Sequence, residues 1–400
     1  MARDLITIEE ARTLVLGAVQ PLGAETVVLA EALGRVLAAQ IRAAGDVPPF
    51  ACSAMDGYAV HSGPAGRTLD VVAESRAGAP AERILSEGEA IRVSTGAAVP
   101  GGADAVVRQE DAEEHGERIS VAVAVAPGAN IRGAGEDLRG GSPVLSAGTV
   151  LGPAELGYAV AAGVAELTVA RRPRVAILCT GDELRAPGEP LGPGEIHNSN
   201  APMLEALAAR AGGLVDPIER VRDSREATRS ALGNALDRAD VVVVSGGVSV
   251  GPHDHVKPAL EALGVEEIFW GVALQPGKPT WFGEREGKLV FGLPGNPVSA
   301  VVTFTLFAAP ALAALQGAAA RHRIIEQVPL GLAVKRNSRR EQALRVRLER
   351  RDGQVVAVPN GPQGSHLVSS LVGADGLAFI PAGDGELPAG TVVALERLAR

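Results

Sequence analysis

The sequence has 400 residues, of which 46% are hydrophobic and 21% are charged. This length and composition predict a globular protein of about two to four domains and exclude a disordered, collagen-like or coiled-coil chain. The net charge of −9 argues against nucleic acid as the main partner.

Cysteine usage and hydrophobic patterning indicate a cytoplasmic protein. Cys52 and Cys179 are too few for a disulfide framework and too isolated for a zinc cluster, which favours a reducing compartment. The first ten residues are acidic and unlike a signal peptide. Residues 289–320 carry no charge and are long enough to span a membrane. Because this stretch begins with Gly-Leu-Pro-Gly-Asn-Pro and contains Pro310, we predict a strand, a turn and a buried helix there instead.

The N-terminal region shows helical patterns on both sides of a segment that has β-type patterns instead. Thr7 and Glu10 have the spacing of a capping box, so a helix is expected to begin there. Further helices are expected over residues 25–39 and 153–165. These segments predict a helical linker domain made of residues 1–47 and 138–170.

Between the helical segments lie short β-type runs that are broken by glycine. The runs cover residues 69–73, 90–93, 105–108 and 119–125. They predict a β-rich inserted domain over residues 48–137.

After Pro173 the sequence alternates between strand and helix patterns. Strands are expected over 174–179, 214–221, 241–244 and 288–291, and helices over 201–211, 225–236, 257–263 and the charge-free segment. Continuous apolar strands between helices imply a parallel sheet that is covered on both faces. We therefore predict a central α/β domain over residues 171–326.

The last part of the chain has the period of a half-buried strand. Leu344 and Val346 alternate with Arg345 and Arg347, and further β-type runs follow. They predict a small C-terminal β-barrel domain over residues 327–400. The arginine face is either solvated or in contact with an anionic ligand.

Three predicted strands of the α/β domain end in loops suited to anions, and ligands of such sheets bind at the carboxyl ends of strands. The first loop places Asp182 and Glu183 directly after a buried strand. Paired carboxylates suit Mg²⁺ held between protein and phosphate. The alternative is that Thr180 or Asp182 caps a turn.

The second loop runs from Ser245 to Asp254 and is rich in glycine. Its glycines let backbone N–H groups approach an anion, and Ser245 and Ser249 add hydroxyl donors. No Gly-Lys-Ser/Thr follows, so it is not a Walker loop. Asp254 is either a metal or water ligand, or a helix N-cap.

The third loop, residues 292–299, enters a helix through a stiff Pro-Gly-Asn-Pro turn, and Lys278 lies on a proline-rich turn just upstream. Together the three loops predict a phosphate-containing ligand. The inserted domain adds a cluster around Asp56, Thr95 and residues 130–137, for which ordinary turns and a solvated salt bridge are the alternative.

These segments together resemble the molybdopterin molybdenumtransferases, the MoeA and gephyrin E-domain family. The matching segments occur in family order over nearly the whole chain. They are residues 53–59, 95–97, 130–137, 180–184, 245–251, 276–279, 292–299 and 364–366.

The resemblance implies a multidomain α/β fold of four subdomains, with a central molybdopterin-binding α/β domain. It further implies an elongated homodimer whose active site lies between the sheet domain of one subunit and the inserted β domain of the other. The implied reaction joins molybdenum from molybdate to the dithiolene of adenylated molybdopterin, with Mg²⁺ or another divalent cation present, and releases AMP. An adenylyltransferase would supply the substrate. Neither nucleic acid nor a membrane is an expected partner.

The same resemblance assigns roles to residues of this sequence. The catalytic residues would be Asp56, Thr95, Asp137, Glu183, Asp223 and Asp254, with Glu183 and Asp254 as the metal ligands. The substrate-binding residues would be Arg132, Thr180, Gly181, Asp182, Ser245, Gly246, Gly247, Ser249, Gly251, Lys278, Pro294, Gly295, Asn296, Pro297, Arg345 and Ser365. Arg345 and Ser365 follow from pattern more than from motif. Gln275 and His255 depart from the lysine and tyrosine that are common at these positions in relatives.

Two other functions fit part of this pattern. A molybdopterin adenylyltransferase shares the sheet domain, but it would be a short single-domain chain with a Gly-Gly-Thr-Gly loop. A cofactor-binding scaffold without turnover would keep or lose the acids of the site, and all of them are present here.

Overall fold

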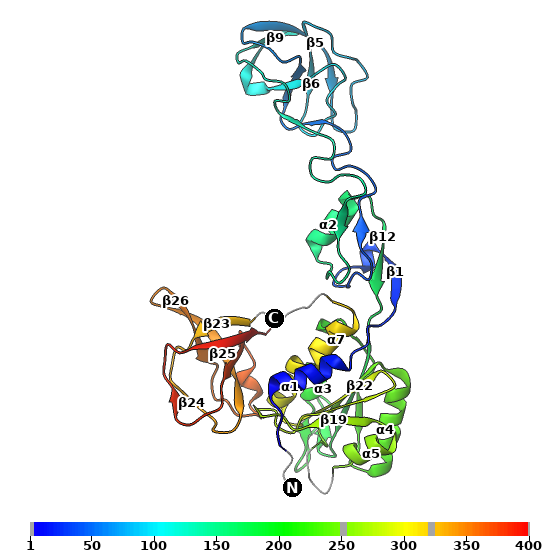
Figure 1. The fold of residues 1–400 in the computed structure, drawn as a ribbon, viewed down its shortest axis with the longest axis vertical. Helices are drawn as coiled ribbons and strands as arrows, with labels where there is room; N and C mark the ends of the chain where they lie inside the picture. Colours follow the sequence, from blue (N-terminus) through cyan, green and yellow to red (C-terminus); the bar gives the residue numbers. More distant parts are fainter. Residues whose placement is uncertain (1–3, 249–253, 319–324, 399–400) are drawn as a thin grey trace.

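Figure 1 shows an elongated molecule with two domains at one end and a third at the other. The computed structural model describes residues 4–248, 254–318 and 325–398. The sheet domain and the C-terminal β domain lie beside each other, while the domain that contains β5, β6 and β9 lies at the far end, beyond a narrow neck (Figure 1).

The sheet domain is built on a seven-stranded mixed sheet. Its parallel strands, in spatial order, are β16 (Leu214–Val215), β13 (Arg174–Thr180), β18 (Val241–Ser245) and β22 (Lys288–Leu293), and β17 (Glu219–Val221) also pairs with β13. The strand expected over residues 214–221 is therefore two short strands, separated around Pro217, which has no N–H to donate. The sheet continues in β21 (Trp281–Arg285) and β19 (Glu266–Trp270), an antiparallel edge that the sequence analysis did not foresee.

Helices cover both faces of this sheet, as the sequence predicts. One face packs against α1 (Ile8–Gly17), α3 (Asn200–Arg210) and the apolar helix formed by α6 (Pro297–Thr303), a π-helical segment η3 (Phe304–Ala308) and α7 (Ala309–Leu315). The other face packs against α4 (Arg225–Arg238) and α5 (Val256–Ala262). The apolar helix is long enough to cross a membrane, but 72% of its residues are buried inside the protein. It is a core helix of the sheet domain.

The far domain is rich in β-structure, as predicted, and its main sheet has six strands in the order β7-β4-β6-β5-β9-β8. The strands are β4 (Gly57–Val60), β5 (Arg67–Ser75), β6 (Glu89–Val93), β7 (Ala105–Arg108), β8 (Ala112–His115) and β9 (Arg118–Val121). A 3-10 turn, η2 (Gln109–Asp111), joins β7 to β8, and β3 (Cys52–Ser53) pairs with β10 (Ile131–Arg132) at its base.

The neck is not the helical domain that the sequence suggested. Residues 25–39 contain β1 (Ala24–Val28) and a short 3-10 turn, η1 (Leu29–Glu31), and β1 pairs with β12 (Glu166–Ala170). The β-branched run Thr26-Val27-Val28 favours a strand. The remaining elements of the neck are α2 (Pro153–Ala161) and the pair β2 (Ile41–Arg42) and β11 (Pro143–Leu145).

The C-terminal domain is a six-stranded sheet in the order β20-β25-β27-β29-β23, with β26 paired to β25. Its strands are β20 (Leu274–Gln275), β23 (Ile325–Pro329), β25 (Glu341–Arg351), β26 (Gln354–Pro359), β27 (Gly376–Ile380) and β29 (Val392–Arg397). A bridge between Leu330 and Ala357 curls the sheet back on itself. Two strand pairs and one 3-10 turn complete the described chain. The pairs are β24 (Val334–Lys335) with β28 (Glu386–Leu387) and β14 (Leu184–Arg185) with β15 (Ile196–His197), and the turn is η4 (Val368–Ser370).

The C-terminal domain is joined to the sheet domain by backbone pairing and by a shared core. β20, which follows the sheet domain's β19 in the chain, pairs with β25 of the C-terminal domain. Ala343, Leu377 and Phe379 belong to the same apolar cluster as the sheet domain's core helices. The two domains therefore share one packed core on this side.

The capping box at the start of α1 offers a test of how this core is stabilised. The Thr7 side chain accepts the Glu10 N–H, and Glu10 accepts the Thr7 N–H in return. Thr7→Ala should lower the free energy of unfolding of the sheet domain by about 0.5–2 kcal/mol. Urea unfolding followed by tryptophan fluorescence measures it, because Trp270 and Trp281 both lie in this domain. Thr13→Ala on the exposed face of the same helix is the control, and an equal loss in both variants would contradict the assignment.

Candidate active site

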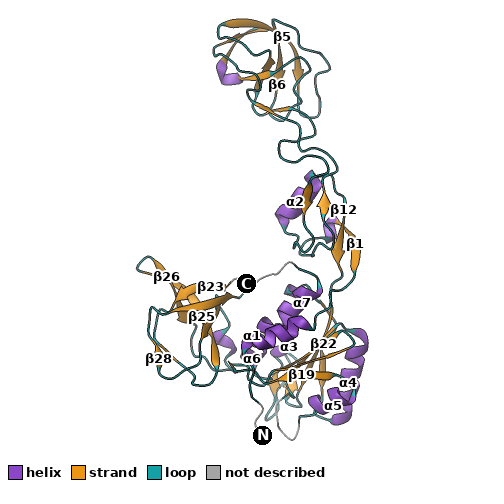
Figure 2. Ribbon diagram, in the orientation of Figure 1, coloured by secondary structure: helices purple, strands orange, loops and turns teal. Residues whose placement is uncertain are grey.

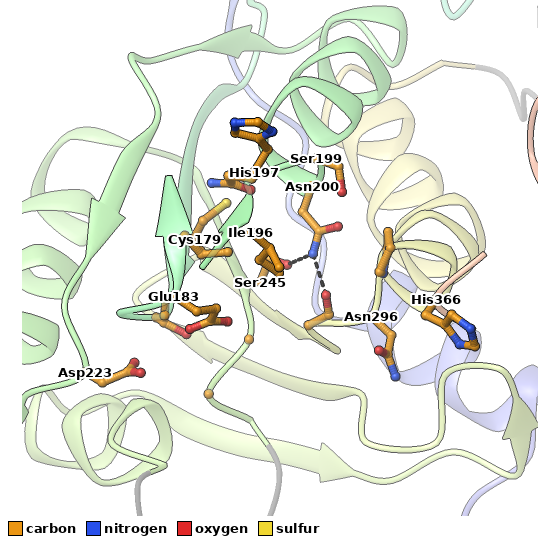
Figure 3. A pocket seen from close by; sticks show the side chains of 18 of the residues that line it. Cys179, Glu183, Ile196, His197, Ser199, Asn200, Asp223, Ser245, Asn296 and His366 are labelled. Atoms are coloured by element: carbon orange, nitrogen blue, oxygen red, sulfur yellow. Dashed lines mark hydrogen bonds between the residues drawn. The ribbon is translucent and has the colours of Figure 1, made fainter. Parts of the chain in front are cut away.

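A cavity of about 780 Å³ opens where β13, β18 and β22 end. The register of the sheet creates it, because Cys179 of β13 and Leu293 of β22 both lie opposite Ser245 of β18. The loops that follow these strands must leave the sheet at the same edge, and they form the walls of the cavity (Figure 3).

Many of the residues singled out in the sequence line this cavity. They are Thr180, Gly181, Glu183, Asp223, Ser245, Gly246, Gly247, Asp254, Gly295, Asn296 and Pro297. Asp182, Lys278, Pro294, Arg345 and Ser365 are not among the lining residues, and Ser249 and Gly251 lie outside the described residues.

Backbone contacts hold the first loop beside the end of β17. Gly181 has a φ of +148°, and a Cβ placed there would lie 2.5 Å from a carboxylate oxygen of Glu183, so Glu183 folds closely over this glycine. Asp182 and Asp223 each accept the backbone N–H of the other at 3.3 Å. This exchange ties the end of β13 to the end of β17 and leaves Glu183 and Asp223 at the cavity (Figure 3).

The second loop depends on glycine for both conformation and space. Gly246 and Gly247 have φ values of +94° and +65°, which L-residues rarely adopt. A Cβ on Gly246 would lie 2.8 Å from Thr180 Oγ1, and one on Gly247 would lie 2.6 Å from Val256. The Gly246 N–H donates to the Leu293 carbonyl at 3.0 Å, so an anion in the cavity would use the Gly247 N–H.

One wall of the cavity was not predicted from the sequence. Residues 196–200 line it just before and at the start of α3. The Asn200 Nδ2 group donates to Ser245 Oγ at 2.8 Å and to the Gly295 carbonyl at 2.7 Å, so it connects three loops (Figure 3). The polar run His-Asn-Ser-Asn before a helix was the available signal, but it reads equally well as a helix start.

The C-terminal domain also reaches the cavity. His366 and Val368 line it, and the Val298 N–H at the start of α6 donates to the Ser365 carbonyl at 3.0 Å. Ser365 therefore contacts the cavity wall through its backbone. The resemblance included His366 in a matching segment but did not assign it a role.

Acidic groups dominate the charge of the cavity. Glu183, Asp223 and Asp254 line it, and no lysine or arginine does so within the described ranges. Cys179 forms part of the floor; burial raises the pKa of its thiol, and a hydrogen bond with Asn198 opposes this rise. Cys179 is thus a buried thiol that stays protonated at neutral pH. A cluster of three or more His, Cys, Asp or Glu side chains that could hold a metal does not occur among residues 4–248, 254–318 and 325–398.

The sequence left the arginine face of this strand either solvated or in contact with an anionic ligand, and at Arg345 the structure excludes the solvated alternative. Its residue surface is 0% exposed, because the face of β25 that carries Ala343 and Arg345 packs towards the sheet domain. Its guanidinium donates to Ser370 Oγ at 3.1 Å and to the Gly364 carbonyl at 3.3 Å. Burial lowers the pKa of Arg345 to about 10, so the side chain remains charged at neutral pH.

Four other assigned residues lie in the far part of the molecule. The Thr95 N–H donates to Asp56 Oδ1 at 2.7 Å. Arg132 and Asp137 line a second cavity of about 400 Å³ at the base of the far domain, together with Cys52. Within one chain, the neck separates these residues from the cavity at the sheet (Figures 1 and 2).

Comparison with known families accounts for nearly the whole chain. Residues 6–163 match the MoeA N-terminal region (domain I and II), residues 176–314 match a probable molybdopterin binding domain, and residues 327–398 match the MoeA C-terminal region (domain IV). These regions extend well beyond the sheet domain that a single-domain adenylyltransferase would have.

Full-length relatives agree with this match. The chain is 35% identical to the molybdopterin molybdenumtransferase of Haemophilus influenzae, with 98% of each chain covered. It is 38% identical to molybdopterin molybdenumtransferase 2 of Mycobacterium tuberculosis, with 92% of this chain and 93% of the relative covered. A crystal structure of the molybdopterin biosynthesis protein MoeA from Pyrococcus horikoshii superimposes with a TM-score of 0.83 at 30% identity, covering 99% and 100% of the two chains.

The chain has the multidomain α/β fold of a molybdenum cofactor biosynthesis protein. It belongs to the MoeA family of molybdopterin molybdenumtransferases.

The steric constraint on the glycine turn at the cavity can be tested by adding one methyl group. Gly194 and Gly246 both have positive φ, but a Cβ on Gly194 would meet nothing within 4 Å. Gly194→Ala should cost about 1 kcal/mol of unfolding free energy from backbone strain, whereas Gly246→Ala should cost about 2–4 kcal/mol because Thr180 must also move. Urea unfolding by tryptophan fluorescence measures both values, and equal losses would show that the Thr180 contact carries no constraint.

Proposed function

We propose that this chain transfers molybdenum from molybdate to the dithiolene of adenylated molybdopterin and releases AMP. The observation that carries the proposal is the cavity at the ends of β13, β18 and β22, which is lined mainly by residues of the matched molybdopterin-binding region. Such a ligand carries phosphate groups that the Gly247 N–H can reach, whereas the Gly246 N–H donates to the Leu293 carbonyl at 3.0 Å.

The acidic lining supports a divalent cation, Mg²⁺ or a similar ion, as part of this site. Carboxylate oxygens are the ligands such cations prefer, and Glu183 and Asp254 bring them to the cavity from two different loops. Because the described residues offer no complete cluster, phosphate oxygens of the substrate would complete the coordination. When bound, the cation would neutralise phosphate charge that the acids alone would repel.

The protein's own side chains would then bind and orient the substrate. Glu183 and Asp254 would hold the cation, the Thr180 hydroxyl and the Gly247 N–H would contact phosphate, and the stiff turn at Asn296 and Pro297 would shape the molybdate end of the cavity. The fixed positions of these groups limit the motion of the substrate during transfer.

A second copy of the chain would complete the site. Asp56 and Thr95 are tied to each other in the far domain, and the neck keeps them away from the cavity of their own chain. A homodimer in which each far domain reaches the partner's sheet domain would bring them to it. The chain would work in the cytoplasm, since Cys52 and Cys179 are buried free thiols, and would receive its substrate from an adenylyltransferase.

The acids of the cavity provide the test. Glu183→Gln and Asp254→Asn each remove one negative ligand while keeping the shape of the side chain, and AMP release from adenylated molybdopterin with molybdate and Mg²⁺ should fall by at least ~100-fold. Glu205→Gln, on the exposed side of α3, should retain wild-type turnover. AMP release by both cavity variants at the wild-type rate would overturn the role of the acids, and a wild-type protein that binds without molybdate-dependent AMP release would indicate a scaffold.

A further inference from the structure

The Asn200 side chain makes two hydrogen bonds at the cavity, and none of the residue roles assigned from the sequence accounts for them. It is the first residue of α3, and its amide reaches the end of β18 and the loop before α6. Ser245 is 45 residues away in sequence and Gly295 is 95. One side chain thus fixes the relative position of three loops around the cavity.

The hydrogen bonds determine which way the amide faces. The Gly295 carbonyl can only accept a hydrogen bond, so the group 2.7 Å from it must be the amide nitrogen of Asn200. The same nitrogen then donates to Ser245 Oγ at 2.8 Å. The Asn200 Oδ1 atom is buried without a hydrogen-bond partner in the described structure. A buried acceptor without a hydrogen-bond partner destabilises the fold. Such unfavourable groups occur mainly at functional sites.

This orientation determines the direction of the Ser245 hydroxyl. Its oxygen accepts from Asn200, and its own proton has no acceptor among the residues that the structure describes. Ser245 lines the cavity although only 3% of the residue is exposed. The hydroxyl proton is therefore available to an acceptor inside the cavity.

We propose that Asn200 is a positioning residue that sets the Ser245 hydroxyl as a hydrogen-bond donor to a phosphate oxygen of the bound molybdopterin. The inference rests on the proposed function, because it requires a phosphate-bearing ligand in this cavity. Asn200 acts through the Ser245 hydroxyl.

Substitution by aspartate reverses this hydrogen bond. In Asn200→Asp the carboxylate can only accept, so it takes the Ser245 proton away from the ligand. The affinity for molybdopterin should fall at least as far as in Ser245→Ala, by about ten- to a hundredfold. Lowering the pH should restore affinity in Asn200→Asp, because the protonated carboxyl can donate to Ser245 again. A purely structural role would not give this pH dependence.

Asn198→Asp is the matched control. Asn198 lines the same cavity and accepts the Ala201 N–H, so its replacement adds the same charge without touching Ser245. In a Ser245→Ala background, the effect of Asn200→Asp should shrink to that of Asn198→Asp, whereas the effect of Asn198→Asp should be the same in both backgrounds. Asn200→Ala provides a second cycle that introduces no charge, and its effect should also shrink in that background.

The measurement is equilibrium binding of molybdopterin, without molybdate or turnover, to variants whose circular dichroism matches the wild type. Wild-type affinity in Asn200→Asp and Asn200→Ala, or full additivity with Ser245→Ala in both cycles, would overturn the inference while leaving the proposed function intact. A wild-type protein that does not bind molybdopterin would overturn both.

Discussion

The parallel pairing of three strands is the constraint from which the cavity follows. Val241–Ser245 is paired on both sides, with β13 and with β22, and its four valines are completely buried between helices on the two faces of the sheet. Each such side chain contributes about 1.5–3 kcal/mol to stability, and a slip by one residue would turn every side chain of the strand to the opposite face. The register is therefore strongly specified, and it places the ends of β13, β18 and β22 at one edge of the sheet. The glycines and acids after these strands can gather around one ligand only because of this alignment.

The neck imposes the second constraint on function. Two segments of the chain pass between the sheet domain and the far domain, and the contact of β1 with β12 and of β2 with β11 holds them together. This elongated form keeps Asp56 and Thr95 away from the cavity in their own chain. If these residues act in the reaction, a dimer is a requirement of the geometry. The C-terminal domain behaves differently, because it shares a core with the sheet domain and places His366 directly at the cavity.

The sequence predicted those features that local pattern controls. The capping box at Thr7 and the buried strand at Val241–Ser245 both depend on residues that are neighbours in the chain. The helix expected over residues 25–39 was wrong because β1 is stabilised by a partner strand about 140 residues away, which a local period cannot show. The antiparallel edge formed by β19 and β21 was also missed, although its pairing is local, with Arg285 of β21 opposite Lys288 of β22.

At the cavity, too, local sequence patterns were predictable and long-range contacts were not. The three strand-end loops were found because glycine, proline and acidic residues after apolar strands have a chemical meaning of their own. Asn200 was missed because asparagine at a helix start is ordinary, and its role exists only through Ser245 and Gly295. The sequence correctly predicted that the side chains of Leu344 and Arg345 lie on opposite faces of their strand. The burial of the face that carries Arg345 was not predicted, because it depends on the packing of one domain against another.

The central claim is that the cavity of one subunit and the far domain of another form one active site, and complementation between two inactive variants tests it most directly. Asp56→Ala removes an acid of the far domain, and Glu183→Gln alters the cavity. Each variant alone should be inactive, but after mixing and dimer exchange the heterodimers should contain one intact site. Random pairing then predicts about a quarter of the wild-type rate of molybdate-dependent AMP release. If the exchanged mixture remains as inactive as the separate variants, the two clusters do not meet between subunits and the account is wrong.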